Sequence, residues 1–334
     1  GQQPIKGPRE TYLIHNGEIY NHKKIRSQVI SYPFQSQSDS ESILGLYHQY
    51  GKDCVDHLDG VFAFAISDGD DILVARDPIG VKPLYIGQDH KGQGWFASES
   101  KALQGVCVHW QEFPAGHRFT LKGGLERWYT RPWFDEAHPM GDESLLRSHL
   151  EMAVKKRLMS DRPVGVFLSG GLDSSLVASI MAQHGQPKTF SIGTSDDSPD
   201  LHQARKVASF LGSDHQELIL SPKDGIKLLP QVISHLETFD VTTIRASTPM
   251  FALSKMISDK GIKVVLSGDG ADEIFGGYRY FHSAPSAQEF QAESVRRIHR
   301  LSSADVLRAD RSTMAHGLEA RVPFLDLDFL DQAM

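Results

Sequence analysis

A short glycine- and serine-rich segment, residues 169–175 (SGGLDSS), carries the strongest chemical pattern in this sequence. Its adjacent glycines let backbone N–H groups approach a ligand closely, and its serines offer hydroxyl groups. An apolar run precedes the segment and a helical pattern follows it, so the positive end of a helix would face the same ligand. Together these features favour phosphate oxygens. The residues expected to contact phosphate are Ser169, Gly170, Gly171, Ser174 and Ser175.

Asp173 lies within this segment and would repel a phosphate unless a cation lay between the two. It therefore indicates a Mg²⁺ ligand, because Mg²⁺ is commonly held by one or two carboxylates together with substrate phosphates. The segment lacks the lysine of the GxxxxGK[ST] pattern, so it is a different kind of phosphate loop. A serine and glycine turn that merely caps a helix is the alternative interpretation.

The elements around this segment predict an α/β domain with a parallel sheet. Short apolar strands are expected at residues 164–168, 189–192 and 264–266, and helices at 145–158, 176–184 and 202–211. Strands that alternate with helices are typical of βαβ units. Open sheets of this kind bind ligands at the carboxyl ends of their strands, where the glycine- and serine-rich segment would lie.

The first part of the chain has a different pattern, which predicts short strands separated by turn residues. Strands are expected at residues 11–15, 61–67, 71–75, 83–87, 94–98 and 117–121, and a helix at 41–50. The first strand would end at Asn16-Gly17, a dipeptide that favours a hairpin turn. Residues 131–144 contain prolines, a glycine and several acids, which indicates a linker. We therefore expect one domain at 1–130 and another at 145–334, joined by the linker 131–144.

The composition excludes several classes of protein. The 334 residues carry a net charge of −7, so general nucleic-acid binding, which needs basic patches, is not expected. The longest fully apolar run covers residues 61–66 and is far too short to span a bilayer, so no membrane partner is expected. Two cysteines, Cys54 and Cys107, cannot build a disulfide framework, and a reduced, cytoplasmic location fits them.

Several longer motifs resemble one known family, in the same order along nearly the whole chain. Residues 169–175 resemble the signature loop of the PP-loop ATP pyrophosphatases. The segments that resemble glutamine-dependent asparagine synthetases are 16–21 (NGEIYN), 76–85 (RDPIGVKPLY), 97–103 (ASESKAL), 240–250 (DVTTIRASTPM), 266–278 (LSGDGADEIFGGY) and 318–326 (LEARVPFLD). The resemblance implies two domains. The first is an α+β N-terminal-nucleophile hydrolase, an αββα sandwich that is truncated here, and the second is an α/β parallel-sheet PP-loop synthetase domain.

The resemblance implies the synthesis of asparagine. ATP would activate the side-chain carboxylate of aspartate as β-aspartyl-AMP, with release of pyrophosphate, and ammonia would then displace AMP. ATP and Mg²⁺ are the implied cofactors, with Asp173 and Asp272 as the metal ligands. The further nucleotide contacts that the resemblance implies are Leu168, Ile192, Ser267 and Gly268.

The aspartate-binding residues that the resemblance implies are Thr242, Thr243 and Arg245, the last because a guanidinium fork suits a carboxylate. The implied catalytic residues of this domain are Asp269, Asp272 and Arg245. Asp269 stands where some family members carry Glu, so it keeps the charge but reaches one methylene less far. A structural salt bridge for Arg245, and a helix N-terminus for Asp272, are the alternatives.

In the first domain the resemblance implies glutamine hydrolysis. Asn16 and Gly17 would form the oxyanion hole and count as catalytic residues. The implied glutamine-binding set is Asn16, Gly17, Glu18 and Asp39.

Three functional residues of the family are expected outside this sequence. The nucleophile of the family is an N-terminal cysteine, and an arginine binds the glutamine carboxylate. Both residues would precede Gly1, because the NGEIYN segment begins as early as residue 16. A lysine that stabilises adenylate formation would follow Met334. Both ends are therefore interpreted as truncated. Cys54 and Cys107 are remote from the glutamine motifs and are not expected to replace the nucleophile.

Two alternatives stay open. A β-lactam-forming synthetase has the same architecture and adenylates a different carboxylate, but such relatives commonly lack an intact NGEIYN segment. A relative of another class would bind nucleotide without catalysis, against which the retention of Asp173, Asp272 and Arg245 argues. The small-molecule partners expected are aspartate, glutamine or ammonia, and ATP, and the sequence leaves a homodimer open.

Overall fold

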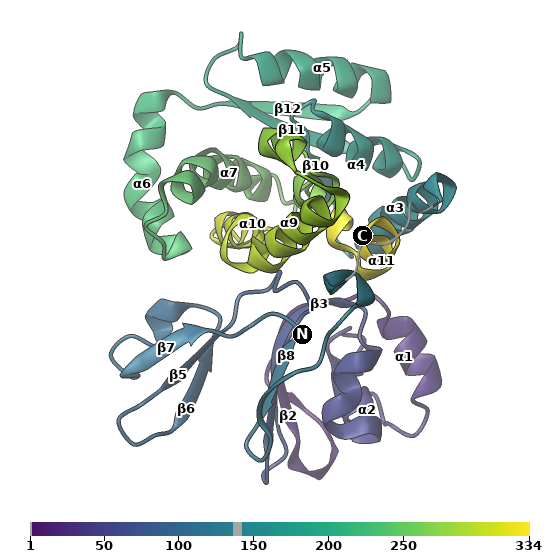
Figure 1. Cartoon of the computed structure of the whole chain (residues 1–334), viewed down its shortest axis with the longest axis vertical. Helices are drawn as coiled ribbons and strands as arrows, with labels where there is room; N and C mark the ends of the chain where they lie inside the picture. The colour runs from purple at the N-terminus through teal and green to yellow at the C-terminus, as the bar shows by residue number, and fades with distance from the viewer. Residues whose placement is uncertain (1, 136–141) are drawn as a thin grey trace. The chain divides into compact units, whose positions relative to one another are not determined.

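A computed structural model describes residues 2–135 and 142–334 of the chain. The chain divides into two compact units, one ending at Arg131 and the other beginning at Pro132 (Figure 1). Residues 136–141 of the predicted linker lie outside the described residues, so the linker 131–144 stays a prediction. No helix in the described part of the chain is both long and apolar enough to cross a membrane.

The described part of the first unit contains two antiparallel sheets and two α-helices. Six strands follow the order β1-β2-β3-β4-β8-β9, with bounds Ile5–Lys6, Tyr12–Ile19, Gly60–Ser67, Ile72–Arg76, His117–Thr120 and Gly124–Arg127. Three strands follow the order β6-β5-β7, with bounds Gly94–Ala97, Tyr85–Gln88 and His109–Glu112. The helices are α1 (His22–Gln28) and α2 (Glu41–Tyr50).

These elements form three layers, which Figure 1 shows nearly edge-on. Successive residues of β3 point to opposite faces of the six-stranded sheet. Phe62 and Phe64 belong to the buried cluster that joins this sheet to α1 and α2. Ala63 lies in a second cluster, with Leu84 and Phe113, that joins the other face to the three-stranded sheet. The order helix, sheet, sheet corresponds to part of the expected αββα sandwich.

The hairpin turn predicted at Asn16-Gly17 is wrong. Strand β2 continues through both residues to Ile19, and Asn16 pairs with Ala63 while Gly17 pairs with Phe62. Gly17 has a φ of 142°, and a Cβ there would lie 2.0 Å from the carbonyl oxygen of Val61. Glycine is thus required by the close approach of two strands. Pairing with a distant strand overrides the local turn preference of the dipeptide.

The second unit has five strands and nine α-helices among its described residues. The strands are β10 (Val164–Phe167), β11 (Lys188–Gly193), β12 (Asp214–Ile219), β13 (Val264–Leu266) and β14 (Glu319–Arg321). The helices are α3 (Glu143–Arg157), α4 (Leu172–Ala182), α5 (Pro199–Leu211), α6 (Pro222–Leu236), α7 (Val241–Asp259), α8 (Ala271–Phe275), α9 (Ala287–Arg300), α10 (Asp305–Met314) and α11 (Leu327–Ala333).

All five strands are parallel, in the order β12-β11-β10-β13-β14. The chain moves outward from β10 to β12 and then returns to place β13 on the other side of β10. This reversal is the doubly wound arrangement expected from alternating strands and helices. Phe190, Ile257, Val265 and Ala309 lie in the buried cluster that joins the sheet to α7 and α10.

Two differences from the predicted elements have clear causes. Helix α4 begins at Leu172, four residues before the predicted start, because Ser174 and Ser175 interrupt the apolar pattern although they belong to its first turn. Strands β12 and β14 were not predicted, because their sequences, DHQELI and EAR, are too polar to indicate strands.

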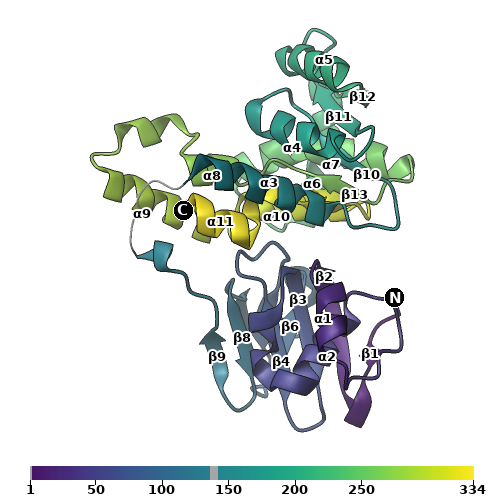
Figure 2. The ribbon, with the colours of Figure 1, turned by 90° about the vertical axis from the view of Figure 1, so that its right-hand side faces the viewer.

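The LEARVPFLD segment is fixed to α3 by buried ion pairs. The carboxylate of Asp326 lies 2.7 Å from Nη1 of Arg157 and 2.8 Å from Nζ of Lys156. Burial acts to raise the pKa of Asp326, but the charges of Arg157 and Lys156 outweigh it and hold that pKa below its usual value. Figure 2 shows α3 beside α11, which directly follows Asp326.

Candidate functional site

The glycine- and serine-rich loop connects β10 to the N-terminus of α4. Its serines fold the loop onto itself: the N–H of Gly171 donates to Oγ of Ser169 at 3.2 Å, and the N–H of Ser169 donates to Oγ of Ser174 at 3.2 Å. Gly170 has a φ of 78°, and a Cβ there would lie 2.5 Å from the backbone of Gln203 and Ala204. Only glycine allows the loop to adopt this conformation against α5.

A second loop, which follows β13, packs directly on the first. A Cβ at Gly268 would lie 3.2 Å from Cβ of Asp173 and 3.2 Å from the backbone nitrogen of Ser174. The two loops leave the carboxyl ends of β10 and β13, which are neighbours where the strand order reverses. Ligands of open α/β sheets bind in the crevice at such a reversal.

A cavity of about 350 Å³ lies at this reversal. It brings together most of the residues predicted to bind nucleotide and metal. Those that line it are Leu168, Ser169, Gly171, Asp173, Ser174, Ile192, Ser267, Gly268, Asp269 and Asp272. Gly170 and Ser175 are not among the lining residues, so their predicted contact with phosphate stays a prediction.

Two carboxylates in this cavity are suited to a cation. Burial, and then the charge of Asp272, raise the pKa of Asp173. Burial, followed by the charges of Asp305 and Asp269, raises the pKa of Asp272. A cation between two such groups would relieve the cost of keeping both ionised. No group of three or more His, Cys, Asp or Glu side chains among the described residues is arranged to hold a metal by itself.

The polar residues that line the cavity without having been predicted to belong to it include Glu273, Tyr278, Asp305 and Arg308. The hydroxyl of Tyr278 donates to the buried Glu273, and the guanidinium of Arg297 lies 4.7 Å from the centre of the Tyr278 ring. Asp305 and Arg308 are on α10, 36 residues or more after Asp269. Their spacing predicts a local ion pair, but nothing in the sequence predicts that the pair reaches β13.

The predicted aspartate-binding residues lie in the first turns of α7 and do not line this cavity. Arg245 lines an adjoining cavity of about 840 Å³, which shares Ile192, Asp200 and Pro249 with the first. The N–H of Thr243 donates to Oδ1 of Asp240, the residue that caps α7, at 2.7 Å. Thr242 and Thr243 line neither cavity, so their predicted contact with aspartate stays a prediction.

In the first unit, the structure brings the predicted glutamine-binding residues together at one end of β2. Asn16, Gly17 and Glu18 are consecutive in this strand. Asp39 reaches them from the segment before α2, because its Oδ2 accepts a hydrogen bond from the N–H of Ile19 at 2.9 Å. The contact spans 20 residues of sequence and could not be inferred from spacing.

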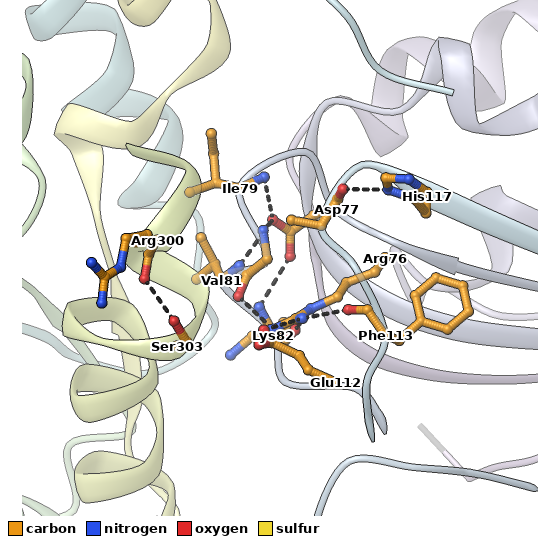
Figure 3. Close-up of polar contacts among 12 residues, drawn as sticks. Arg76, Asp77, Ile79, Val81, Lys82, Glu112, Phe113, His117, Arg300 and Ser303 are labelled. Carbon is orange, nitrogen blue, oxygen red and sulfur yellow. Dashed lines mark hydrogen bonds and ion pairs between the residues drawn. The ribbon is translucent and has the colours of Figure 1, made fainter. Parts of the chain in front are cut away.

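Two charged side chains of the RDPIGVKPLY segment bond to the backbone inside the same unit. Asp77 is buried, and its two oxygens accept hydrogen bonds from five backbone N–H groups, those of Phe62, Ile79, Gly80, Val81 and Lys82 (Figure 3). The buried Arg76 donates to the carbonyl oxygens of Gly80, Lys82 and Phe113. Both charges therefore hold the loop between β4 and β5.

Neither cysteine is suited to be a nucleophile. Cys54 and Cys107 are buried, and burial raises the pKa of both thiols. The reactive species of cysteine is the thiolate, which a raised pKa disfavours.

The fold and the site define a class: a PP-loop type α/β domain that follows a glutamine amidotransferase-like sandwich. The family model described as "Asparagine synthase" matches residues 145–294 and 283–334, and the one described as "Glutamine amidotransferase domain" matches residues 1–116. The chain belongs to the asparagine synthase family. This confirms the predicted fold class and the resemblance on which it rested.

Curated relatives agree with this assignment. The chain is 50% identical over 351 residues to "Asparagine synthetase [glutamine-hydrolyzing] 3" of Arabidopsis thaliana, covering 100% of this chain and 61% of the relative. It is 49% identical to "Asparagine synthetase [glutamine-hydrolyzing] 2" of Oryza sativa subsp. japonica, covering 100% of this chain and 59% of the relative. The chain thus spans about three fifths of the length of these relatives.

Proposed function

We propose that the protein synthesises asparagine from aspartate, ATP and ammonia derived from glutamine, by way of β-aspartyl-AMP, releasing AMP and pyrophosphate. The observation that carries the proposal is the cavity at the reversal of strand order, where Asp173 and Asp272 face the same space as Ser169 and Ser174. A phosphate-binding loop beside two unpaired carboxylates is what a magnesium–nucleotide complex requires.

The chain's own residues would bind and orient ATP. The hydroxyls of Ser169 and Ser174 and the N–H groups at the start of α4 would donate to the pyrophosphate portion. Leu168 and Ile192 would flank the adenine or ribose, and Ser267 and Gly268 would add contacts from the opposite loop. The nucleotide would thereby be held with its α-phosphorus accessible to a carboxylate.

The donor set fits Mg²⁺. Asp173 and Asp272 are hard oxygen ligands in the first turns of α4 and α8, and phosphate oxygens would complete the octahedron that Mg²⁺ prefers. The raised pKa of both carboxyls also favours a cation between them. When bound, Mg²⁺ would neutralise the charge that the phosphates and these carboxylates bring together.

The adjoining cavity is the natural position for aspartate. Arg245 is exposed there, and no ion pair or hydrogen bond ties it to the described residues. Its guanidinium fork can bind a carboxylate, and Thr242 and Thr243 lie within three residues of it. Because the two cavities share Ile192, Asp200 and Pro249, a carboxylate held beside Arg245 could approach the bound nucleotide.

In the first unit we propose glutamine hydrolysis, with Asn16 and Gly17 as the oxyanion hole and Glu18 and Asp39 binding the substrate. The hydrogen bond from the N–H of Ile19 to Asp39 supports this proposal, because it holds Asp39 against the residue that follows Glu18. A carboxylate suits the α-amino group of an amino acid. A cytoplasmic location and a homodimer stay predictions from the sequence.

The test is the release of pyrophosphate by the whole protein with ATP, Mg²⁺ and aspartate. We expect pyrophosphate to require aspartate, and asparagine to form with either glutamine or ammonium as the nitrogen source. Arg245→Leu should raise the KM for aspartate at least about 10-fold and leave the KM for ATP nearly unchanged, since it removes one charged contact. Arg147→Leu, which removes an exposed guanidinium from α3, is the matched control. Pyrophosphate release that ignores aspartate would contradict the proposal.

A further inference from the structure

The nucleotide cavity is strongly acidic. Six carboxylate side chains line it, from Asp173, Asp200, Asp269, Asp272, Glu273 and Asp305. Arg308 is the one cationic side chain among the described residues that line it. The binding of a polyanion such as ATP in this cavity therefore depends on which carboxylates this single positive charge neutralises.

Arg308 joins two of these carboxylates. Its Nη2 lies 2.8 Å from Oδ1 of Asp269, in the loop after β13, and its Nη1 lies 2.5 Å from Oδ1 of Asp305, one turn earlier on α10. The other oxygen of Asp269, Oδ2, accepts a hydrogen bond from Oγ of Ser267 at 2.5 Å. Each oxygen of Asp269 therefore has a partner that restrains it.

The two carboxylates predicted to bind the metal ion, Asp173 and Asp272, have no such restraint. Among the described residues, the side chains of Asp173 and Asp272 make no hydrogen bond or ion pair, and Asp272 is exposed. The cavity thus contains two kinds of carboxylate, one tied to a guanidinium and one open to a cation. The ion pairs of the Arg308 guanidinium are the difference between the two kinds.

We propose that Arg308 is a positioning residue of the synthetase site, which fixes Asp269 and neutralises Asp305 so that a divalent cation is directed to Asp173 and Asp272. This inference rests on the proposed function of the cavity. The planar guanidinium of Arg308 reaches two carboxylates through two different nitrogens, which the single ammonium of lysine cannot do. Without Arg308, the freed carboxylates would compete for the cation and add one uncompensated negative charge against the triphosphate.

The effect on catalysis is tested with Arg308→Met, Arg308→Lys and Asp269→Asn in the whole protein. Arg308→Met should lower kcat for aspartate-dependent pyrophosphate release about 10²-fold, since a displacement of about 1 Å costs roughly that much. Arg308→Lys should recover part of this loss because it restores the charge. When Asp269→Asn is already present, adding Arg308→Met should lower kcat by less than about 3-fold further, because Arg308 acts through Asp269.

The matched control is Arg296→Met, which removes a guanidinium paired with Glu293 on the exposed face of α9. It should leave kcat unchanged. Thermal unfolding of each variant separates lost positioning from lost folding. The inference is overturned if Arg308→Met matches Arg296→Met, or if the effects of Arg308→Met and Asp269→Asn simply multiply.

Calorimetric titration with ATP, with and without Mg²⁺, tests the inference without the reaction. We expect Arg308→Met to weaken the binding of ATP in Mg²⁺ about 10-fold, and Arg296→Met to leave it unchanged. Equal affinity in the two variants would overturn the role of Arg308. If the unmodified protein binds ATP with Mg²⁺ but releases no aspartate-dependent pyrophosphate, the proposed function fails while this titration still decides the role of Arg308.

Discussion

Two motifs that carry the family resemblance use their acidic residues in opposite ways. In RDPIGVKPLY of the first unit, Asp77 is buried and accepts five backbone hydrogen bonds. In SGGLDSS of the second unit, Asp173 lines a cavity, and its side chain makes no hydrogen bond or ion pair with the described residues. The first carboxylate is satisfied by its own chain, and the second is left for a ligand.

The contrast shows that a shared motif is not by itself a site. Asp77 holds a loop, and Asp326 of LEARVPFLD holds a segment to α3 in a similar way. Burial raises the pKa of both Asp77 and Asp173, but at Asp77 the backbone hydrogen bonds and the charge of Arg76 oppose this rise, whereas at Asp173 the charge of Asp272 adds to it. The charged form of Asp173 is therefore disfavoured on folding, with no group among the described residues to offset that cost. Stability given up at one point is typical of functional residues.

The largest effect that would sharpen this comparison is on stability. Asp77→Asn would place an amide NH₂ against backbone N–H donors, which leaves at least two of them without an acceptor. At about 1–3 kcal/mol for each unsatisfied group, we expect the free energy of unfolding to fall by roughly 2–6 kcal/mol. Denaturant unfolding measures it, and Asp70→Asn, in an exposed loop, is the matched control. A change as small as that of the control would show that the loop does not depend on Asp77.

The next effect is on activity alone. Asp173→Asn should lower aspartate-dependent pyrophosphate release about 10²- to 10³-fold, the usual cost of removing one group that stabilises charge in the transition state. The unfolding midpoint should stay the same or rise, because a destabilised carboxylate is removed. Asp196→Asn, at a largely exposed position, is the control. A parallel loss of stability would place Asp173 with Asp77 and remove the contrast.

A smaller and pH-dependent effect is expected at Asp326. Its pKa is lowered in the folded protein, so its contribution to stability is present above the ordinary aspartate pKa of about 3.9 and is lost as the pH falls through the folded value. Asp326→Asn should therefore cost about 3 kcal/mol at pH 7, since it strands the buried Arg157. Urea unfolding of both proteins from pH 7 to pH 3 should show this difference shrinking below about pH 4. A difference that grows with acidity would reverse the assignment.

The smallest effect concerns the contact between the two loops of the cavity. Gly268→Ala would place a Cβ 3.2 Å from Asp173 and Ser174, so the loops must separate by a few tenths of an ångström. We expect the KM for ATP to rise about 10-fold, or about 1.4 kcal/mol, with little change in unfolding. Gly94→Ala, in β6 of the first unit, is the matched control, because a Cβ there would have no neighbour closer than 3.9 Å. An unchanged KM would show that the two loops need not touch.

The sequence predicted most of the strands in both units but was wrong about where β2 ends. Residues 164–168 and 264–266 were expected as strands, and β10 and β13 occupy them almost completely, because short apolar runs flanked by helices are unambiguous. Asn16-Gly17 was read as a turn because the dipeptide has a strong local preference, while its pairing with β3 depends on a segment more than 40 residues away. Local patterns predict well only where long-range pairing agrees with them.

The sequence by itself determined the class of this protein, because the order and composition of its motifs specify the family, the phosphate loop and the carboxylates beside it. The tertiary structure decided which of those groups are available. Asp77, Asp173, Asp269 and Asp326 look alike in the sequence, yet only Asp173 is left without a partner among the described residues. Hydrogen bonds and ion pairs between distant segments make that difference, and Arg308 reaches Asp269 only because α10 packs where the sheet reverses.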